Sequence, residues 1–151
     1  MIAIKNVTAH TMAAPAVINQ AVVLINDGKI IDLGTNIEIP EGTEVIDGEG
    51  GFLMPGIIDA HCHIGMWEDG IGFEGDDGNE MTNPVTPELR AVDAINPLDR
   101  AFEEALDAGI TTVATGPGSA NVIGGYFATL KTYGRSVDDM VINDATALKT
   151  A

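Results

Sequence analysis

Residues 55–63 read Pro55-Gly56-Ile57-Ile58-Asp59-Ala60-His61-Cys62-His63, an apolar, β-branched run that begins with Pro-Gly. This composition is typical of a buried strand. Because alternate side chains of a strand share a face, we expect Asp59, His61 and His63 on one side and Cys62 on the other. The Cα atoms of the two histidines would lie about 7 Å apart, so both imidazoles can reach one divalent ion. A zinc-type ion takes three or four ligands, so other residues must complete such a site.

The composition indicates a folded domain with a strong acidic excess. The chain has 151 residues, and 45% of them are hydrophobic, which is enough for one ordinary core. It carries 23 Asp and Glu against 7 Lys and Arg, which argues against nucleic acid and anionic membranes as partners. We recognise no secretory signal and no membrane-spanning stretch, and the single cysteine has no partner for an internal disulfide. We therefore expect a cytoplasmic chain.

Residues 1–54 predict a small antiparallel β unit. Apolar and other residues alternate over residues 2–7, and two β-branched runs flank the pair Asp27-Gly28, a hairpin signal because such a turn requires positive φ. A further run at 44–47 lies between Gly-containing turns. So few strands would leave exposed edges for another segment to cover.

The segment that follows the His-X-His strand, residues 64–95, shows no clear periodicity. Connections of this length in compact domains are usually functional lids or disordered inserts. Its carboxylates do not follow the spacing of a helix-loop-helix calcium site, so we interpret them as a solvated loop.

A helix is predicted next. Asn96 is placed as its N-cap, Pro97 at its first position and Gly109 just after its end, with apolar residues at helical spacing between them. Residues 110–115 then predict a second strand, and a strand, a helix and a strand in this order give a parallel pair. The loop 116–121 should therefore emerge at the same sheet edge as the two histidines, where ligands of parallel sheets bind.

The remaining residues predict more strands and a last helix. Residues 126–132 fit either a strand or a helix, and their β-branched and aromatic residues favour a strand. Residues 137–142 are interpreted as another short strand. The pair Asn143-Asp144 predicts the N-cap of a helix that begins at Ala145.

The hairpin region, the run at 44–47 and the stretch 55–63 together resemble the amino-terminal part of the metal-dependent amidohydrolase superfamily, especially its imidazolonepropionase-like members. In that family a small β-sandwich, built from both ends of the chain, flanks a (β/α)8 barrel, and the His-X-His motif ends the first barrel strand. The resemblance implies an α/β fold. Residues 1–54 would form part of the β-sandwich, and residues 55–151 the first strands and helices of an incomplete TIM-type barrel, since a complete one takes about 250 residues.

The resemblance also implies chemistry. His61 and His63 would be metal ligands, with zinc expected and manganese, iron or nickel as alternatives. The family's other ligands (a lysine or glutamate, further histidines and an aspartate) and its general base come from later barrel strands, so the catalytic residues are unassigned here. The implied activity is hydrolysis of a non-peptide C–N bond, of the cyclic amide or amidine type, in a small-molecule substrate by metal-activated water. We expect little or no catalysis by this chain alone.

The residues around the motif allow more than one interpretation. His61 and His63 can also be ordinary core histidines, and Asp59 can support the metal site or be a polar residue low in the barrel. Cys62 is interpreted as packing against a helix.

Loop residues are open in the same way. Ser119 has no histidine near it in the sequence to act as a base. Asn121 and Trp67 either touch substrate or lie on loop surface.

A second hypothesis comes from a different class of function. It is a non-catalytic metal-binding or assembly module, completed by homo-oligomerisation or by a partner chain, because unpaired edges and part of a barrel would expose apolar surface. A third hypothesis is that the chain has no role of its own and does not fold stably.

Overall fold

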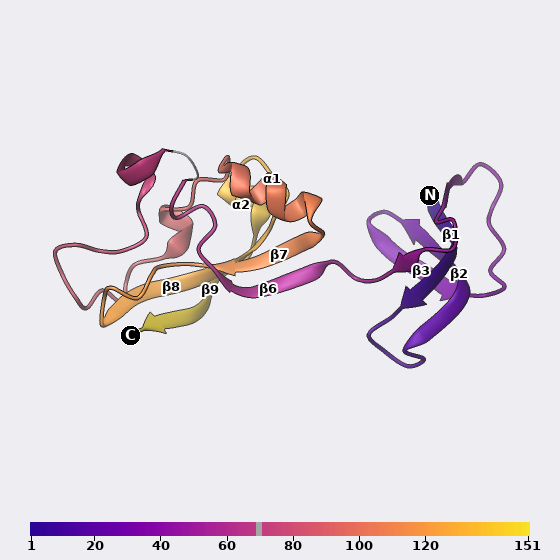
Figure 1. The fold of residues 1–151 in the computed structure, drawn as a ribbon, viewed down its shortest axis with the longest axis horizontal. Helices are drawn as coiled ribbons and strands as arrows, with labels where there is room; N and C mark the ends of the chain where they lie inside the picture. Colours follow the sequence, from indigo (N-terminus) through magenta and orange to yellow (C-terminus); the bar gives the residue numbers. More distant parts are fainter. Residues whose placement is uncertain (69–70) are drawn as a thin grey trace. The chain divides into compact units, whose positions relative to one another are not determined.

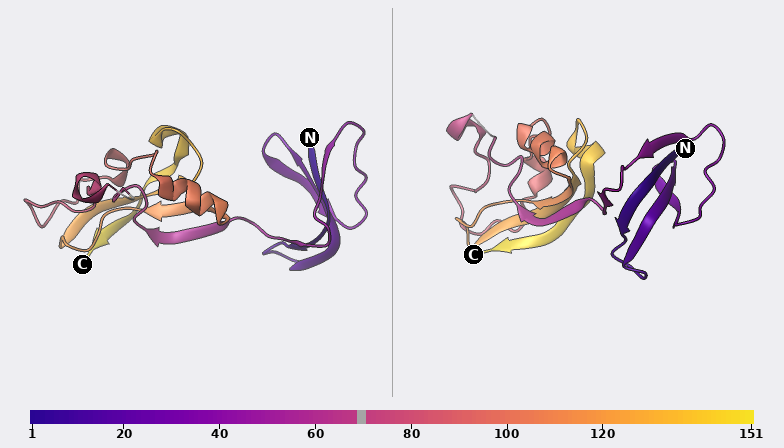
Figure 2. Two further views of the ribbon diagram at one scale, coloured as in Figure 1. Left: turned by 45° about the horizontal axis from the view of Figure 1, so that its top comes forward. Right: turned by 45° about the vertical axis from the view of Figure 1, so that its right-hand side comes forward.

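The computed structural model describes residues 1–68 and 71–151, which form two compact units, Met1–Pro55 and Gly56–Ala151 (Figures 1 and 2). Each unit contains one mixed β-sheet, and helices are few. None of the described helices is long and apolar enough to cross a membrane.

The first unit is a sheet with the strand order β3-β2-β1-β4, and β5 also pairs with β1. Its strands are β1 (Ile2–His10), β2 (Val17–Asn26), β3 (Lys29–Gly34), β4 (Glu44–Asp47) and β5 (Phe52–Leu53). The first three strands are antiparallel, but β4 and β5 run parallel to β1. The prediction of a wholly antiparallel unit was therefore wrong, because residues 35–43 carry the chain back along the sheet before β4 begins.

The hairpin between β2 and β3 is confirmed. Asn26 pairs with Lys29, and the two turn residues have positive φ, 49° at Asp27 and 71° at Gly28. Both central residues of a type I′ turn have this conformation. The turn therefore sets the register of the two strands.

The second unit has the strand order β6-β7-β8-β9. Its elements are β6 (Ile57–Cys62), the 3-10 helices η1 (Gly72–Gly75) and η2 (Ala91–Asp93), α1 (Arg100–Asp107), β7 (Ile110–Thr115), β8 (Ile123–Lys131), α2 (Val137–Met140) and β9 (Val141–Thr150). Strands β6 and β7 are parallel, as predicted, whereas β7, β8 and β9 are antiparallel. In Figure 1, α1 lies over β7, with which it is in contact.

The core of this unit lies between the sheet and the segments that cover one of its faces. Its buried members are Met66, Ala91, Ile95, Phe102, Val113, Ala128, Leu130 and Met140. Strand β6 was predicted to be buried, yet 47% of Ile57 and 67% of Ile58 are exposed. The reason is that β6 is an edge strand with only β7 beside it in the described part of the chain.

Helix α1 begins later than predicted. Its N-cap is Asp99 and not Asn96: Asp99 Oδ1 accepts a hydrogen bond from Ala101 N, while Asn96 Oδ1 accepts one from Leu98 N in the preceding turn. The second oxygen of Asp99 accepts a hydrogen bond from Gly65 N at 3.0 Å in a buried setting. Asp99 therefore joins the start of the helix to the chain just after the His-X-His motif.

The carboxyl-terminal predictions were partly wrong. Strand β8 is confirmed, but residues 137–140 form the short helix α2, in which Ser136 Oγ accepts from Asp139 N. The predicted helix from Ala145 is strand β9. Asn143 Oδ1 does accept a hydrogen bond from Ala145 N, as a cap would. Pairing with the open edge of β8 overrides this local signal.

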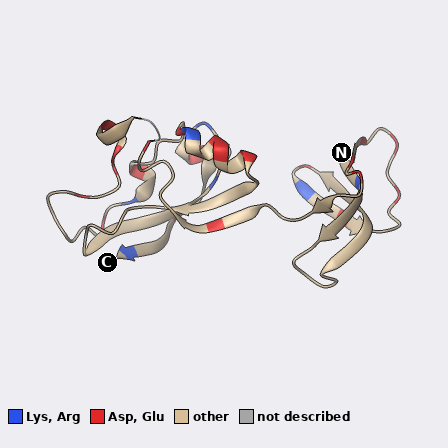
Figure 3. Cartoon of the chain, in the orientation of Figure 1, with Lys and Arg blue, Asp and Glu red and all other residues tan. Residues whose placement is uncertain are grey.

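The described part of residues 64–95 is built into the unit and is not a free lid; residues 69–70 of this segment lie outside the described residues. Bridges from Val85 to Ile123 and from Arg90 to Tyr126 attach it to β8. The interpretation as a solvated loop holds for its tip, where Met81 is 88% exposed. In the cartoon of Figure 3, acidic residues are coloured on this segment and along α1.

We predict that Asp99→Ala lowers the free energy of unfolding by about 2–4 kcal/mol, because it removes the helix cap and leaves the buried Gly65 N–H without a partner. Urea denaturation followed by the fluorescence of Trp67, the single tryptophan, measures this change. The matched control is Asn96→Ala, for which a loss below about 1 kcal/mol is expected. A larger loss for Asn96→Ala than for Asp99→Ala would contradict the assignment of the cap.

Candidate metal centre

The two histidines of the motif lie side by side at the carboxyl end of β6. Their ring centroids are 5.3 Å apart and their planes are at 79°. The register between β6 and β7 is irregular between Asp59 and Cys62, so strict alternation fails there. Cys62 packs against the core of this unit.

The ring of His63 is fixed by a backbone carbonyl. Its Nδ1 lies 2.7 Å from the oxygen of Gly116, the first residue after β7. Because a carbonyl oxygen can only accept, Nδ1 must carry the proton. In the neutral ring Nε2 then has a free lone pair, the state in which a histidine binds a metal ion. His63 therefore fits the chemistry of a metal ligand.

Two aromatic rings enclose this pair. Phe127, a buried residue of β8, lies 5.2 Å from the His61 ring and 6.1 Å from the His63 ring, measured between centroids. Trp67 lies 5.1 Å from His63 in an edge-on arrangement. Lys149 Nζ lies 5.9 Å from the Phe127 ring centroid. Sequence reasoning did not identify Phe127 as part of the site, and its side-chain type gave no signal.

The structure also places the other candidate residues near the motif. Asp59 Oδ1 accepts a hydrogen bond from the backbone N of His61 at 3.1 Å. Burial raises the pKa of the Cys62 thiol. Ser119 is exposed.

Asn121 and Trp67 do not lie on loop surface. Asn121 is 3% exposed, and its Nδ2 donates to the carbonyl oxygens of Glu80 and Asn83. Asn121 therefore holds residues 80–83 against the loop after β7. Trp67 is half-buried beside His63.

Within residues 1–68 and 71–151, no group of three or more His, Cys, Asp and Glu side chains is placed to hold a metal ion. The third histidine, His10, belongs to the first unit and contacts Phe52. The pair formed by His61 and His63 therefore offers fewer side chains than the three or four ligands that a zinc-type ion takes.

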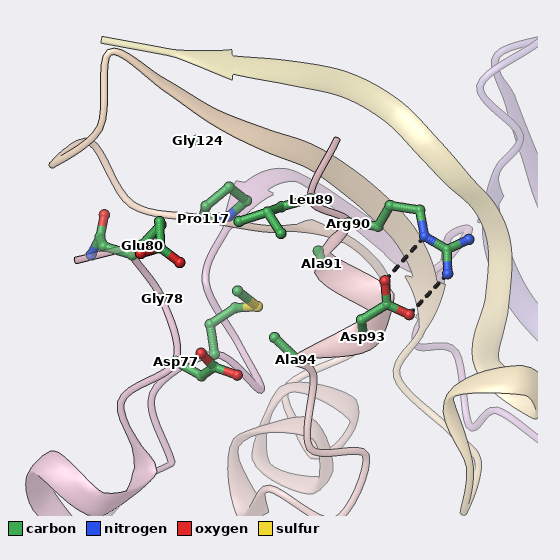
Figure 4. Close-up of a pocket in the computed structure, with 12 residues that line it drawn as sticks. Asp77, Gly78, Glu80, Leu89, Arg90, Ala91, Asp93, Ala94, Pro117 and Gly124 are labelled. Carbon is green, nitrogen blue, oxygen red and sulfur yellow. Dashed lines mark hydrogen bonds and ion pairs between the residues drawn. The ribbon is translucent and has the colours of Figure 1, made fainter. Parts of the chain in front are cut away.

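A cavity of about 220 Å³ lies in the same unit, and its lining includes Met66, Glu80, Leu89 and Pro117 (Figure 4). Arg90 also lines it, but the guanidinium group hydrogen-bonds to the Asp93 carboxylate at 2.9 and 3.1 Å. These bonds raise the pKa of Arg90. Its charge is thus already paired in the described structure.

Comparison with known proteins gives a consistent picture. No family model matches the sequence. The chain is 37% identical over 107 residues to the amidohydrolase tasK of Hapsidospora irregularis, covering 68% of this chain and 11% of that protein. It is 44% identical over 69 residues to the imidazolonepropionase of Idiomarina loihiensis, covering 42% of this chain and 17% of the relative.

The structural comparison covers nearly the whole chain. The crystal structure of an amidohydrolase from Thermotoga maritima MSB8 superposes with a TM-score of 0.91 and 41% identity, covering 99% of this chain and 38% of that one. The chain thus spans well under half the length of the proteins that it matches. It belongs to the amidohydrolase superfamily and corresponds to the amino-terminal part of those proteins.

Proposed function

We propose that this chain is the metal-binding amino-terminal segment of an enzyme that hydrolyses a non-peptide C–N bond in a small cyclic amide or amidine. Membership of the superfamily supports the reaction class, and relatives named imidazolonepropionase and dihydroorotase support a ring substrate. The observation that carries the proposal is the hydrogen bond from His63 Nδ1 to the Gly116 oxygen, since it leaves Nε2 free.

His61 and His63 would hold the divalent ion, with zinc as the first choice and manganese, iron or nickel as alternatives. When bound, such an ion supplies Lewis acidity toward a carbonyl oxygen and toward water. The residues of this chain orient the pair: the Gly116 carbonyl fixes one ring, and Phe127 packs against both. The other ligands and the general base would come from outside this chain, in the length by which its relatives exceed it.

The same proposal gives each unit a place in the complete enzyme. Strand β6, helix α1 and strand β7 form a strand-helix-strand unit with parallel strands, which fits the first unit of a (β/α)8 barrel. Residues 1–54 would contribute to a β-sandwich.

A second candidate function is that of an assembly module that binds another copy or a partner chain. The observation that favours it is the exposure of Ile57 and Ile58 on the edge strand β6. We expect self-association of the purified chain in sedimentation velocity experiments if this candidate is correct. A monodisperse monomer would count against it.

We predict that the chain binds Co²⁺ or Ni²⁺ through the histidine pair, with quenching of Trp67 fluorescence, because the indole lies 5.1 Å from the His63 ring. A fluorescence titration should saturate near one ion per chain, and the double variant His61→Ala/His63→Ala should show no saturable quenching. The matched control is His10→Ala, which removes the third histidine from the other unit and should leave the titration unchanged. Equal quenching in the double variant would overturn the assignment of the ligands.

We also predict no measurable hydrolysis of a cyclic amide by the isolated chain with zinc added, because the described residues do not complete a metal site. The rate should equal that of zinc in buffer. Turnover that disappears in His61→Ala/His63→Ala would show instead that the chain assembles a working site.

A further inference from the structure

Phe127 is the side chain that the two histidines share. It is 6% exposed on β8, two strands away from β6, and its ring lies within 6.1 Å of both imidazole centroids. His61 is exposed, and within the described residues its ring forms no hydrogen bond. The orientation of His61 therefore depends on ring contacts with Phe127 and His63.

Gly116 allows this arrangement because it has no side chain. A Cβ atom at Gly116 would lie 2.5 Å from two atoms of the Phe127 ring and 2.9 Å from its Cα. The ring thus occupies the space that a side chain would need. The carbonyl of the same glycine accepts the hydrogen bond from His63. Ring, glycine and imidazole form one packed group.

The Lys149 ammonium lies 5.9 Å from the Phe127 ring centroid, within the range of a cation–π contact. Lys149 belongs to β9 and pairs with Gly125 in the sheet. The ring is therefore contacted from β9 as well as from β6 and the loop after β7.

We propose that Phe127 is a positioning residue, whose ring, seated on Gly116, holds His61 and His63 so that His63 keeps its proton on Nδ1 and offers Nε2 to a divalent ion. The role of Nε2 as a metal donor rests on the proposed function, whereas the packing of Phe127 and the tautomer of His63 do not require a metal ion. Neutral imidazole in water prefers the proton on Nε2, so the surroundings must impose the opposite tautomer. Loss of the outer-shell hydrogen bond that fixes the tautomer of a metal-binding histidine, here the bond to the Gly116 oxygen, typically changes metal affinity by about 10- to 100-fold.

The test uses the metal-free chain with ¹⁵N-labelled histidine at pH 8. In the unmodified chain, the ring nitrogens of His63 should show the proton on Nδ1. In Phe127→Leu, the two tautomers should mix, and the zinc affinity measured by competition with a chelating dye should fall at least about tenfold. The control is Leu130→Ala, a fully buried residue of the same strand, which should lower stability and leave the tautomer unchanged.

A second pair of variants covers the case in which Phe127→Leu fails to fold. Gly116→Ala should displace the Phe127 ring and mix the tautomers, whereas Gly124→Ala should not, because its nearest neighbours would lie at 3.5 Å, an ordinary contact distance. The proposal is overturned if His63 carries its proton on Nε2 in the unmodified chain. It is equally overturned if Phe127→Leu, or Gly116→Ala where the former does not fold, keeps both the tautomer and the zinc affinity.

The two proposals can fail separately. If Phe127→Leu mixes the tautomers but zinc binding does not depend on the histidines, the metal proposal is wrong and the positioning role stands. If zinc binds through the histidines and Phe127→Leu changes neither the tautomer nor the zinc affinity, the metal proposal stands and the positioning role is wrong.

Discussion

The parallel pairing of β6 with β7 is the constraint on which the candidate site depends. The register places Cys62 opposite Thr115, so the end of β6 lies beside Gly116. Thr115 is fully buried, and its Oγ1 donates to the Ile64 oxygen at 2.7 Å, while Asp99 accepts from Gly65 N. The chain directly after His63 is thus held both by β7 and by the start of α1. The histidines are attached to a rigid end of the sheet and not to a free loop.

The glycines after β7 are explained by the aromatic rings beside them. A Cβ atom at Gly116 would meet the Phe127 ring, and one at Gly118 would lie 3.0 Å from the Trp67 ring. Trp67 also fills the space next to Gly78, which lies in the segment 64–95. Gly118 N donates to the Gly78 oxygen at 2.8 Å. Absent side chains thus let two rings and two loops meet beside His63.

Sequence reasoning succeeded where the deciding information is local. The Asp27-Gly28 turn requires positive φ and has it, and Gly109, with φ of 83°, ends the segment that contains α1. It failed where distant residues decide. Asn96 and Asp99 are both acceptable N-caps by type, but only Asp99 also accepts from Gly65 N, 34 positions away. The motif predicted that His61 and His63 are neighbours, but it could not identify Phe127, which reaches them across the sheet.

The open edge of β6 has a consequence for the proposed function. In the described sheet β6 has β7 on one side and no strand on the other, so the open edge of β6 is the place where a further strand can pair. Ligands on such a strand would approach at its carboxyl end, where His61 is exposed. His63, in contrast, is half-buried and already fixed by Gly116. Under the proposed function, folding of residues 56–151 orients this first ligand before the others arrive, so completing the site requires the addition of donors and no rearrangement of His63.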